Sequence, residues 1–130
     1  MKVKEKIENV KRIEEFFTLF HRKISKKIFS KLSKEKINVP QFHILKVLQE
    51  EGECTMSHLA ARLYITTSAT TNLVTKLLKS GLIDRSHSPK DRRIILIEIN
   101  KRGKEIVERA WNQICGFFNS LLSNLSLKER

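Results

Sequence analysis

The chain has 130 residues, enough for one domain with a hydrophobic core and too few for a separate catalytic module. Its 26 Lys and Arg outnumber 14 Asp and Glu, and the formal net charge of +12 at pH 7 favours a polyanionic partner, nucleic acid above all. No apolar run approaches the roughly 20 residues of a spanning helix, and no signal-peptide core begins the chain. We interpret Cys54 and Cys115 as free thiols, which suit a reducing compartment. We therefore expect a cytoplasmic protein without a membrane partner.

The first predicted element is a long amphipathic helix over residues 4–34. Its apolar side chains recur at three- and four-residue intervals: Ile7, Val10, Ile13, Phe17, Phe20, Ile24, Ile28 and Leu32. Phe16, Leu19 and Phe29 widen the apolar stripe, which indicates either a partner subunit or a thick core within one subunit. Residues 21–36 contain seven Lys or Arg and one Glu, which we interpret mainly as a solvated helix face.

Two shorter helices are predicted next. Pro40 fits the first turn of one, because its ring fixes φ and its missing N–H would have no helical partner, and Gly52 ends that helix. Thr55 is expected to cap the following helix, although His58 stands where a capping box prefers Glu or Gln. Their inward faces are apolar: Phe42, Leu45, Leu48, Met56, Leu59, Ala60 and Leu63. Residues 64–65 form a tight link to the next helix.

The fourth predicted helix begins at Thr66 or Thr67 and runs to Ser80, and Gly81 stops it. One of its faces is expected to pack inward: Thr70, Leu73, Val74 and Leu77. The opposite face has short polar side chains and no carboxylate: Thr67, Ser68, Thr71, Asn72, Thr75 and Lys76. Together with Thr66 at the start of the helix, these are the predicted DNA-binding residues of the helix. A helix rich in Thr is locally unfavourable, so we expect a compensating role for it.

Contact with the major groove of double-stranded DNA would supply that role. Small hydroxyls let the helix approach phosphates, Thr methyl groups can meet thymine methyls, and Asn72 can offer a bidentate amide to adenine. A merely solvated helix is the alternative for this segment alone.

A two-stranded hairpin is predicted after this helix. Leu82 and Ile83 begin one strand, residues 94–99 alternate in the returning one, and a turn at residues 86–89 separates them. Residues 84–104 contain seven basic and three acidic side chains. The predicted DNA-binding residues of this wing follow the turn: Lys90, Asp91, Arg92 and Arg93. Arginine here can enter the adjoining minor groove, whereas we expect the aspartate to orient a neighbouring guanidinium.

The last predicted element is another long helix, capped by Asn100. Its apolar side chains are also numerous: Ile106, Val107, Ala110, Trp111, Ile114, Phe117, Phe118, Leu121 and Leu125. The apolar stripes of residues 4–34 and 101–125 are wider than one subunit requires. We therefore predict a homodimer formed through both helices.

Taken together, the chain resembles the MarR-type winged helix-turn-helix transcriptional regulators over nearly its whole length. The order and spacing of short motifs carry the resemblance: Pro40-Gln41-Phe42-His43-Ile44-Leu45, Leu59-Ala60-Ala61-Arg62-Leu63, Leu73-Val74-Thr75-Lys76-Leu77, Gly81-Leu82-Ile83-Asp84-Arg85, Asp91-Arg92-Arg93 and Gly103. It implies a mainly α fold with a small β-hairpin wing, as a single domain over residues 1–130. Residues 38–99 would form the winged-helix lobe that binds DNA, and residues 4–34 and 101–125 the dimerisation helices.

The resemblance also implies a function. Members of this family are homodimers that bind pseudo-palindromic double-stranded DNA, usually repress transcription, and are released by a small molecule or an oxidant. In the wing, the resemblance pairs Asp91 with an arginine and places Arg92 or Arg93 in the minor groove. It further implies one more helix that completes the dimer interface, and the sequence ends at Arg130 without one. We expect either a naturally short chain that dimerises through its first and last helices or a truncated one.

An effector pocket between the dimer helices and the DNA-binding lobe is a further implication of the resemblance. Its expected lining is largely aromatic: Phe17, Phe20, Phe42, Trp111 and Cys115. Ordinary core packing is the alternative for each of these side chains, and Cys115 fits a packed thiol better than a redox sensor. We expect no metal and no cofactor. Cys54, His58, Cys115 and His21 are scattered, and a zinc site normally needs four converging ligands.

Other functional classes are less consistent with the sequence. The glycines at 52, 81, 103 and 116 do not compose a phosphate-binding loop, and no nucleophile elbow is present, so we expect no enzyme. A basic RNA-binding or protein-interaction module on a winged-helix scaffold, without ligand response, is the main alternative. It is disfavoured because the seven Phe lie on periodic apolar stripes instead of forming an exposed stacking platform.

Overall fold

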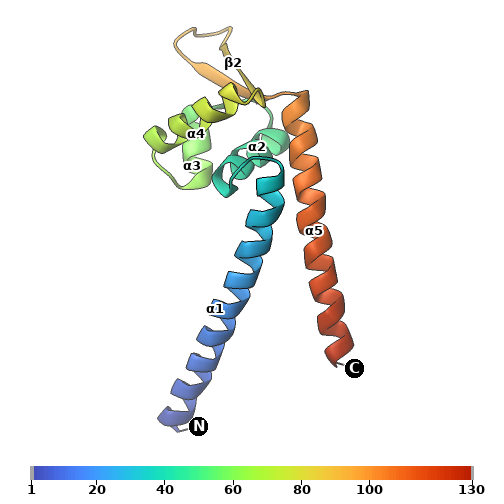
Figure 1. The fold of residues 1–130 in the computed structure, drawn as a ribbon. Coiled ribbons are helices and arrows are strands. Elements are labelled where there is room, and N and C mark those ends of the chain that lie inside the picture. The colour runs from blue at the N-terminus through green and yellow to red at the C-terminus, as the bar shows by residue number, and fades with distance from the viewer. Residues whose placement is uncertain (1, 130) are drawn as a thin grey trace.

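Five helices and three strands make up residues 2–129, the part of the chain that the structure, a computed structural model, describes; side chains are described for residues 2–124. The elements in chain order are α1 (Val3–Lys34), α2 (Val39–Glu51), β1 (Cys54–Thr55), α3 (Met56–Leu63), α4 (Thr67–Lys79), β2 (Ile83–His87), β3 (Ile95–Ile99) and α5 (Lys101–Glu129). The predicted fold class, mainly helical with a small antiparallel sheet, is confirmed (Figure 1).

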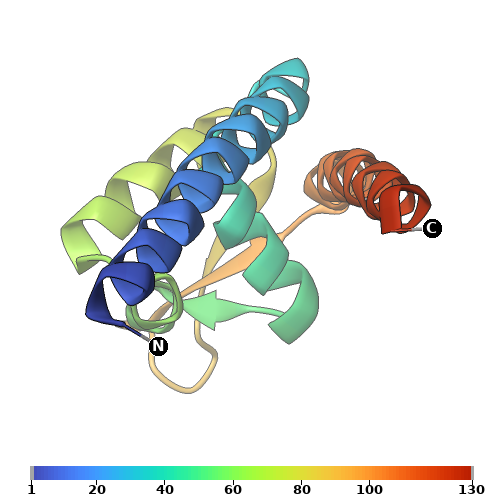
Figure 2. The ribbon, with the colours of Figure 1, turned by 90° about the horizontal axis from the view of Figure 1, so that it is seen from below.

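The elements form a lobe from which two long helices lead away. The lobe consists of α2, α3, α4 and the sheet, and the far ends of α1 and α5 lie on the side opposite the hairpin (Figure 1). Seen from below, α1 crosses the lobe obliquely while α5 is viewed nearly end-on at one side (Figure 2). The two long helices therefore diverge with distance from the lobe instead of forming one parallel pair.

The core of the lobe is built around α2, which contacts α1, α3, α4, α5 and β3. The most deeply buried apolar side chains of this core come from α2, from the elements that it contacts and from β2: Leu32, Ile44, Leu45, Leu48, Leu59, Val74, Leu77, Ile83, Ile97 and Val107. Burial of this apolar surface is the main stabilising term for the lobe. The inward faces that the periodicity predicts for α2, α3 and α4 are thus confirmed.

The sheet has three strands in the order β1-β3-β2, all antiparallel. Strand β1 pairs Cys54 with Ile97 and was not predicted, because two residues are too few to show alternation. Strand β2 extends to His87, which pairs with Ile95, so the turn predicted at residues 86–89 is misplaced. The loop covers residues 88–94 instead, because backbone pairing at this exposed end of the hairpin does not require apolar side chains.

Side-chain caps fix where the helices begin. Asn38 forms a reciprocal capping box with Gln41: Asn38 Oδ1 accepts from Gln41 N at 2.9 Å, and Gln41 Oε1 accepts from Asn38 N at 3.0 Å. Pro40 lies in the first turn as predicted, but the cap itself was missed. The predicted caps Thr55 and Asn100 are both confirmed by hydrogen bonds to backbone N–H groups of α3 and α5.

Residues with positive φ end the lobe helices. Gly52 follows α2 with φ of 83°, and Gly81 follows α4 with φ of 73°, a conformation that glycine adopts without steric cost. Tyr64 ends α3 with φ of 57° although it carries a Cβ, and the N–H of Ile65 donates to Ala60 O at 3.2 Å. The stop at Tyr64 leaves only residues 64–66 between α3 and α4, which makes a tight helix-turn-helix arrangement.

Most of α1 does not contribute to the core of the subunit. Leu32 is its one buried residue within the described part of the chain, whereas Ile13, Phe16 and Phe17 are 57%, 62% and 63% exposed. A thick core within one subunit is therefore the wrong explanation of the wide stripe. Leu125 of the predicted stripe on α5 lies outside the residues whose side chains are described. Within the described residues, no helix has the length and apolar character to span a bilayer.

Candidate nucleic-acid interface

Helix α4 presents a polar face to solvent and is anchored by the opposite one. Thr70, Val74 and Leu77 are buried, and Leu73 is half-buried against the core. The seven residues predicted to bind DNA at this helix, the six of the outward face and the cap Thr66, are all exposed: Thr66, Thr67, Ser68, Thr71, Asn72, Thr75 and Lys76. The face contains no carboxylate that would repel phosphate. The structure thus confirms the predicted orientation of this helix, while its contact with DNA stays a prediction.

The N-terminus of α4 is well defined. Thr66 caps it, and its Oγ1 accepts from Ala69 N at 3.0 Å. The first turn has no acidic residue. Unpaired N–H groups and the helix dipole make such an end attractive to anions. The hydroxyl oxygen of Thr66 already accepts a hydrogen bond as the cap of α4, so its first role is to stabilise the start of the helix.

The threonine hydroxyls on the outward face are hydrogen-bonded within the helix. Thr71 Oγ1 donates to Thr67 O at 2.9 Å, and Thr75 Oγ1 donates to Thr71 O at 2.8 Å. Each hydroxyl proton is thus used locally, which leaves an acceptor oxygen and a methyl group for external contacts. This arrangement favours methyl contact with thymine over donation to phosphate at these two positions.

The wing loop is ordered by its own backbone hydrogen bonds. Ser88 N donates to Ile94 O at 2.9 Å, and Ile94 N donates to Asp91 O at 3.0 Å. Ser88 Oγ accepts from Lys90 N at 3.3 Å, and His87 Nδ1 lies 2.8 Å from Arg92 O. The sequence analysis did not predict these contacts of His87 and Ser88. A serine hydroxyl that accepts a hydrogen bond from the N–H two residues later is nevertheless a known turn motif. These contacts give the basic tip a defined shape.

Asp91 holds Arg93 by three contacts. Its Oδ1 accepts from Arg93 N at 3.0 Å and from Arg93 Nε at 3.2 Å, and its Oδ2 accepts from Nη2 at 3.3 Å. The Arg93 side chain, through its hydrogen bonds, lowers the pKa of Asp91 below its usual value. Arg93 still has 92% of its side chain exposed. The prediction that Asp91 orients a neighbouring guanidinium is confirmed, and Arg93 is the arginine concerned.

The two predicted contact elements lie in the same part of the molecule. Helix α4 packs against β2, and β2 leads directly into the wing loop. Both lie at the end of the lobe away from the far ends of α1 and α5 (Figure 1). Helix α4, strand β2 and the wing loop carry exposed basic side chains: Lys76, Lys79, Arg85, Lys90, Arg92 and Arg93. A polyanion along this surface could therefore meet the helix and the loop together.

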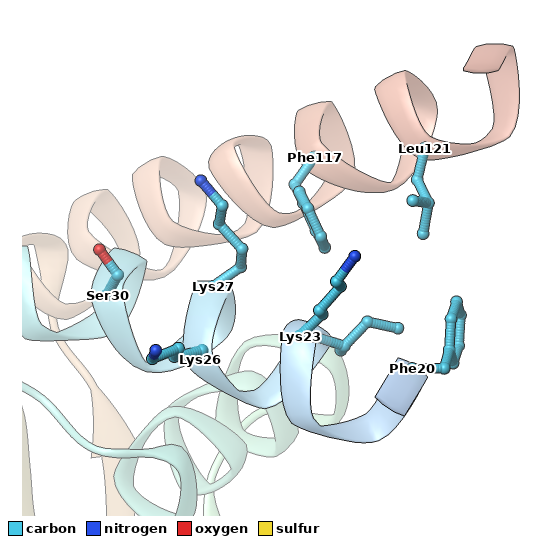
Figure 3. A pocket seen from close by; sticks show the side chains of 8 residues that line it. Phe20, Lys23, Lys26, Lys27, Ser30, Phe117 and Leu121 are labelled. Carbon is cyan, nitrogen blue, oxygen red and sulfur yellow. The ribbon is translucent and has the colours of Figure 1, made fainter. Parts of the chain in front are cut away.

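The structure does not bring the five predicted effector-pocket residues together in one subunit. Phe42 is buried and stacks on Trp111, with ring centroids 6.4 Å apart. Phe20 instead lines a cavity between α1 and α5 (Figure 3), and Phe17 lines a separate shallow hollow on α1. Cys115 is half-buried on α5. Of the five residues, Phe42 and Trp111 are in contact, and the grouping of all five as an effector pocket stays a prediction.

The scattered histidines and cysteines have separate surroundings. His58 Nε2 lies 3.1 Å from Glu51 Oε1, and His21 Nδ1 lies 3.2 Å from Ser25 Oγ. Cys54 is buried, which raises the pKa of its thiol. Within the described residues, no three His, Cys, Asp or Glu side chains are grouped as metal ligands would be.

An ion-pair cluster that the sequence did not reveal joins α2 to α3. Glu51 Oε2 accepts from Arg62 Nε at 2.9 Å, while its other oxygen faces His58. The hydrogen bonds from Arg62 and then His58 lower the pKa of Glu51. The partners are 11 and 7 residues apart, so helical spacing could not indicate the cluster. It fixes the first helix of the helix-turn-helix to the core helix.

Comparisons with known proteins agree with this geometry. The family model described as MarR family matches residues 37–95. The HTH-type transcriptional regulator YdgG of Bacillus subtilis is 31% identical over 107 residues, which are 81% of this chain and 67% of that protein. The HTH-type transcriptional repressor IacR of Pseudomonas putida is 31% identical over 78 residues, covering 60% of this chain and 47% of that protein.

A solved structure is also similar along most of the chain. A mutant of S. aureus MepR bound to an oligodeoxyribonucleotide has a TM-score of 0.76 and 25% sequence identity, and the match covers 90% of this chain and 86% of that one. The match to the first curated relatives is shorter, since it spans about half of their length. The family match covers the helix-turn-helix and most of the hairpin, where the candidate interface lies.

Proposed function

The chain belongs to the MarR family, whose members are transcriptional regulators, and we propose that it regulates transcription by binding double-stranded DNA in a sequence-specific manner. The observation that carries the proposal is the exposed, carboxylate-free face of α4 beside an arginine-bearing wing. A helix in the major groove reads base edges, and an arginine in the minor groove responds to its width and negative potential.

The roles of the interface residues follow from their surroundings. Asn72 is proposed to read adenine through its amide, and Thr71 and Thr75 to contact thymine methyl groups. Lys76 and Lys90 are proposed to contact phosphates, which position the protein without reading sequence. Thr66, Thr67 and Ser68 form the N-terminal approach of α4 to the backbone. Asp91, Arg92 and Arg93 form the minor-groove element, with Asp91 acting only through Arg93.

We further propose that the protein is a homodimer on a pseudo-palindromic operator. The support is the exposed apolar stripe of α1, which includes Val10, Phe16 and Leu19, and the exposed Trp111 and Leu122 of α5. Large exposed apolar patches mark interaction surfaces, and a two-fold dimer pairs such a patch with its own copy. Two copies of α4 would then read two half-sites of related sequence.

Repression in the cytoplasm, relieved by a small molecule, is the proposed regulatory outcome. It is supported by the relative that is named a transcriptional repressor. A regulator of this kind acts by occupying DNA, so the protein is proposed to have no catalytic activity. The alternative, an RNA-binding or protein-interaction module, has no observation that favours it over DNA.

A competition titration tests the proposal. A labelled duplex, selected from fragments of the source genome that the protein enriches, is displaced by four unlabelled competitors. They are the same DNA duplex, the same sequence as single-stranded DNA, the same sequence as an RNA duplex, and a scrambled DNA duplex. We expect the matched DNA duplex to compete best, by about 1,000-fold or more over scrambled DNA. Preference for RNA or for single strands, or equal competition by all four, would refute the proposed function.

A further inference from the structure

His87 is the last residue of β2, and the pleat of the sheet determines the side on which its ring lies. It shares a face of β2 with Arg85 and Ile83, because every second residue of a strand points to the same side. Ile83 is buried in the core, and so is Ile97, the partner of Arg85 on β3. Arg85 and His87 are exposed. His87 therefore lies on the core-facing side of the hairpin, beyond the point where the core ends.

This side of the hairpin is the one on which the helices of the lobe pack. Helix α4 contacts β2, and α2 and α3 contact β3 (Figure 1). The wing loop, residues 88–94, follows directly after His87. In a duplex, a major groove and the adjoining minor groove are separated by one sugar-phosphate backbone. With α4 in the first groove and the wing loop in the second, Arg85 and His87 lie between the two and face that backbone.

The contact with Arg92 fixes which ring nitrogen of His87 always carries a proton. Nδ1 lies 2.8 Å from Arg92 O, and a carbonyl oxygen can only accept, so Nδ1 is the donor. This N–H group is present in both the neutral and the cationic ring, so the hydrogen bond to the loop is kept in both forms. Nε2 has no hydrogen-bond partner among the described residues. Nε2 is therefore the atom that gains or loses the titrating proton.

The charged groups around His87 leave a cationic ring without a free counter-charge. Its neighbours on β2 and in the wing loop are mainly basic: Arg85, Lys90, Asp91, Arg92 and Arg93. Asp91 is already paired with Arg93, and Ile95, the partner of His87 on β3, is uncharged. The acidic residues of the two strands pair on the other face of the sheet: Asp84 and Glu98. Helix α4, which packs against β2, contributes only basic side chains: Lys76 and Lys79.

We propose that His87 is a proton-linked contact to the DNA backbone, which holds the wing loop through Nδ1–H and donates from protonated Nε2 to a phosphate between the two grooves. The proposal rests on the proposed function. Histidine is the side chain whose charge ordinarily changes between about pH 5 and 8. A phosphate stabilises the cationic ring through a charge-assisted hydrogen bond, so DNA binding takes up a proton from solvent, at most one per subunit.

The sign of the pH dependence follows from this uptake. At low pH the ring carries its proton before DNA binds, and the contact is complete. As pH rises, the ring in the complex gives up its proton and the contact is lost, so affinity falls. The loop keeps its hydrogen bond from Nδ1 throughout, so the change is one of charge and not of loop structure.

The pH profile of operator affinity tests the proposal. The full chain is titrated into a labelled, enriched genomic duplex at about pH 6, 7 and 8, where histidine titrates. We expect affinity to fall at least about tenfold over this range, the effect of losing one charge-assisted contact. The slope of log affinity against log salt should be steeper at the low end, by about 1 for each subunit. Affinity that is constant with pH, or a salt slope that is the same at both ends, would overturn the proposal.

Two substitutions separate the titrating proton from the loop contact. His87→Asn keeps an amide N–H at the position of Nδ1 but does not titrate. It should match the wild type at about pH 8 and lose most of the gain in affinity at about pH 6. His87→Ala removes both groups and should bind more weakly throughout. The matched control is His43→Asn, because His43 is an exposed histidine of α2 outside the hairpin, and this variant should keep the wild-type profile. If His87→Asn keeps the full profile, or His43→Asn loses it, another group takes up the proton and the proposal is wrong.

The hydrogen bond to the loop is measured without DNA. The nitrogen chemical shifts of a neutral histidine ring differ between the Nδ1–H and Nε2–H forms, and NMR of the full chain above neutral pH reads them. We expect the Nδ1–H form at His87. The Nε2–H form at this residue, or a mixture of the two, would contradict the positioning role of Nδ1.

The proposal and the proposed function fail in different ways. If the operator duplex is bound with one affinity from about pH 6 to 8, the proposed function stands and the proton-linked contact is refuted. If no DNA duplex is bound at any pH, the proposed function is refuted and the phosphate contact with it. The nitrogen shifts then still decide whether His87 holds the wing loop.

Discussion

Arg92 and Arg93 are adjacent in the wing but differ in their surroundings. Arg93 is held by Asp91 through side-chain and backbone contacts. The Arg92 side chain is exposed and is free of any such contact among the described residues. A guanidinium that is already oriented loses less entropy on binding, which favours Arg93 as the better organised minor-groove contact.

Removing either arginine tests this assignment. Arg92→Ala and Arg93→Ala should each weaken DNA binding about tenfold, and each should lower the slope of log affinity against log salt by about 1. Asn72→Ala is the contrast, because loss of a base contact should relax sequence preference with little effect on the slope. The slopes are measured by fluorescence anisotropy at about 50 to 300 mM salt, the range in which the salt dependence of phosphate contacts is readily measured. If the slope is unchanged in both arginine variants, the wing does not contact the DNA.

Glu51 provides a pH-dependent test of the joint between α2 and α3. Its pKa is lowered by hydrogen bonds from Arg62 and His58, so the carboxylate form is stabilised in the folded protein. The stabilisation is present above the ordinary pKa of 4.5 and is lost as pH falls through the lower value of the folded state. Glu51→Gln should therefore lower the free energy of unfolding at pH 7, by a small amount because the cluster is exposed.

The difference between wild type and Glu51→Gln should shrink as pH falls below 4.5, measured by urea unfolding at several pH values. Glu50→Gln is a suitable control, since Glu50 pairs with Lys46 at the longer distance of 3.7 Å. A gap between wild type and Glu51→Gln that persists undiminished at low pH would contradict the assigned role of the carboxylate.

At the scale of elements, Gly103 determines how α5 leaves the sheet. A Cβ at this position would collide with Leu82 O and lie 2.7 Å from Ile99 Cγ1. Gly103→Ala should thus destabilise the protein by about 1–3 kcal/mol through overpacking. Gly116→Ala is the matched control on the same helix, because nothing lies within 4 Å of its added Cβ. It should be neutral or stabilise by up to about 1 kcal/mol through helix propensity.

Urea unfolding of the two glycine variants separates these effects. The midpoint should fall for Gly103→Ala and stay or rise for Gly116→Ala, with similar m-values in both. If Gly103→Ala is as stable as the wild type, the close approach of α5 to Leu82 is not present in solution.

The elements differ in how well the sequence predicted them. Helices α2 to α4 were predicted because caps and apolar spacing lie within a few residues, as at Thr55 and Thr66. Strand β1 was missed because Cys54 and Thr55 pair with Ile97 and Leu96, far along the chain, and that contact leaves no local pattern. The outward face of α4 was predicted completely, since helical periodicity alone determines it.

Three-dimensional features of the site were predicted less well. An ion pair between Asp91 and a neighbouring arginine was predicted, but which arginine it contacts, Arg93, depends on the geometry of the loop. The effector-pocket prediction grouped Phe17, Phe20 and Trp111, and local spacing could not show that Phe17 and Phe20 line different hollows on α1 or that Trp111 stacks on Phe42. Lys23 and Lys27 were interpreted as a solvated face, and only the position of α5 shows that they border a cavity.

At the scale of the whole molecule, the exposed apolar stripe on α1 is the observation that favours the proposed dimer. Phe16 stacks on Phe20 with centroids 5.7 Å apart and meets Phe17 edge to face, yet Phe16 and Phe17 remain mostly exposed. Such an aromatic cluster in water is unfavourable unless a second surface covers it. We expect a dimer whose mass, measured by sedimentation equilibrium, persists to low concentration.

The charged variant Phe17→Glu tests that interface. A buried carboxylate without a partner should shift the protein to monomer and weaken operator binding together. Tyr64→Glu is the control for mass, because Tyr64 is 94% exposed and belongs to the link between α3 and α4, not to either long helix. A wild-type monomer mass that does not change with concentration would contradict the dimer.

Dimethyl sulfate interference mapping on an enriched genomic duplex tests most directly whether α4 and the wing engage adjacent grooves of one DNA. The reagent modifies guanine N7 in the major groove and adenine N3 in the minor groove, so one experiment reports both. We expect interference at N7 positions within each half-site and at flanking N3 positions, with the N3 signals lost in Arg92→Ala or Arg93→Ala. Interference confined to one groove, or N3 signals that survive in both variants, would contradict the two-element interface.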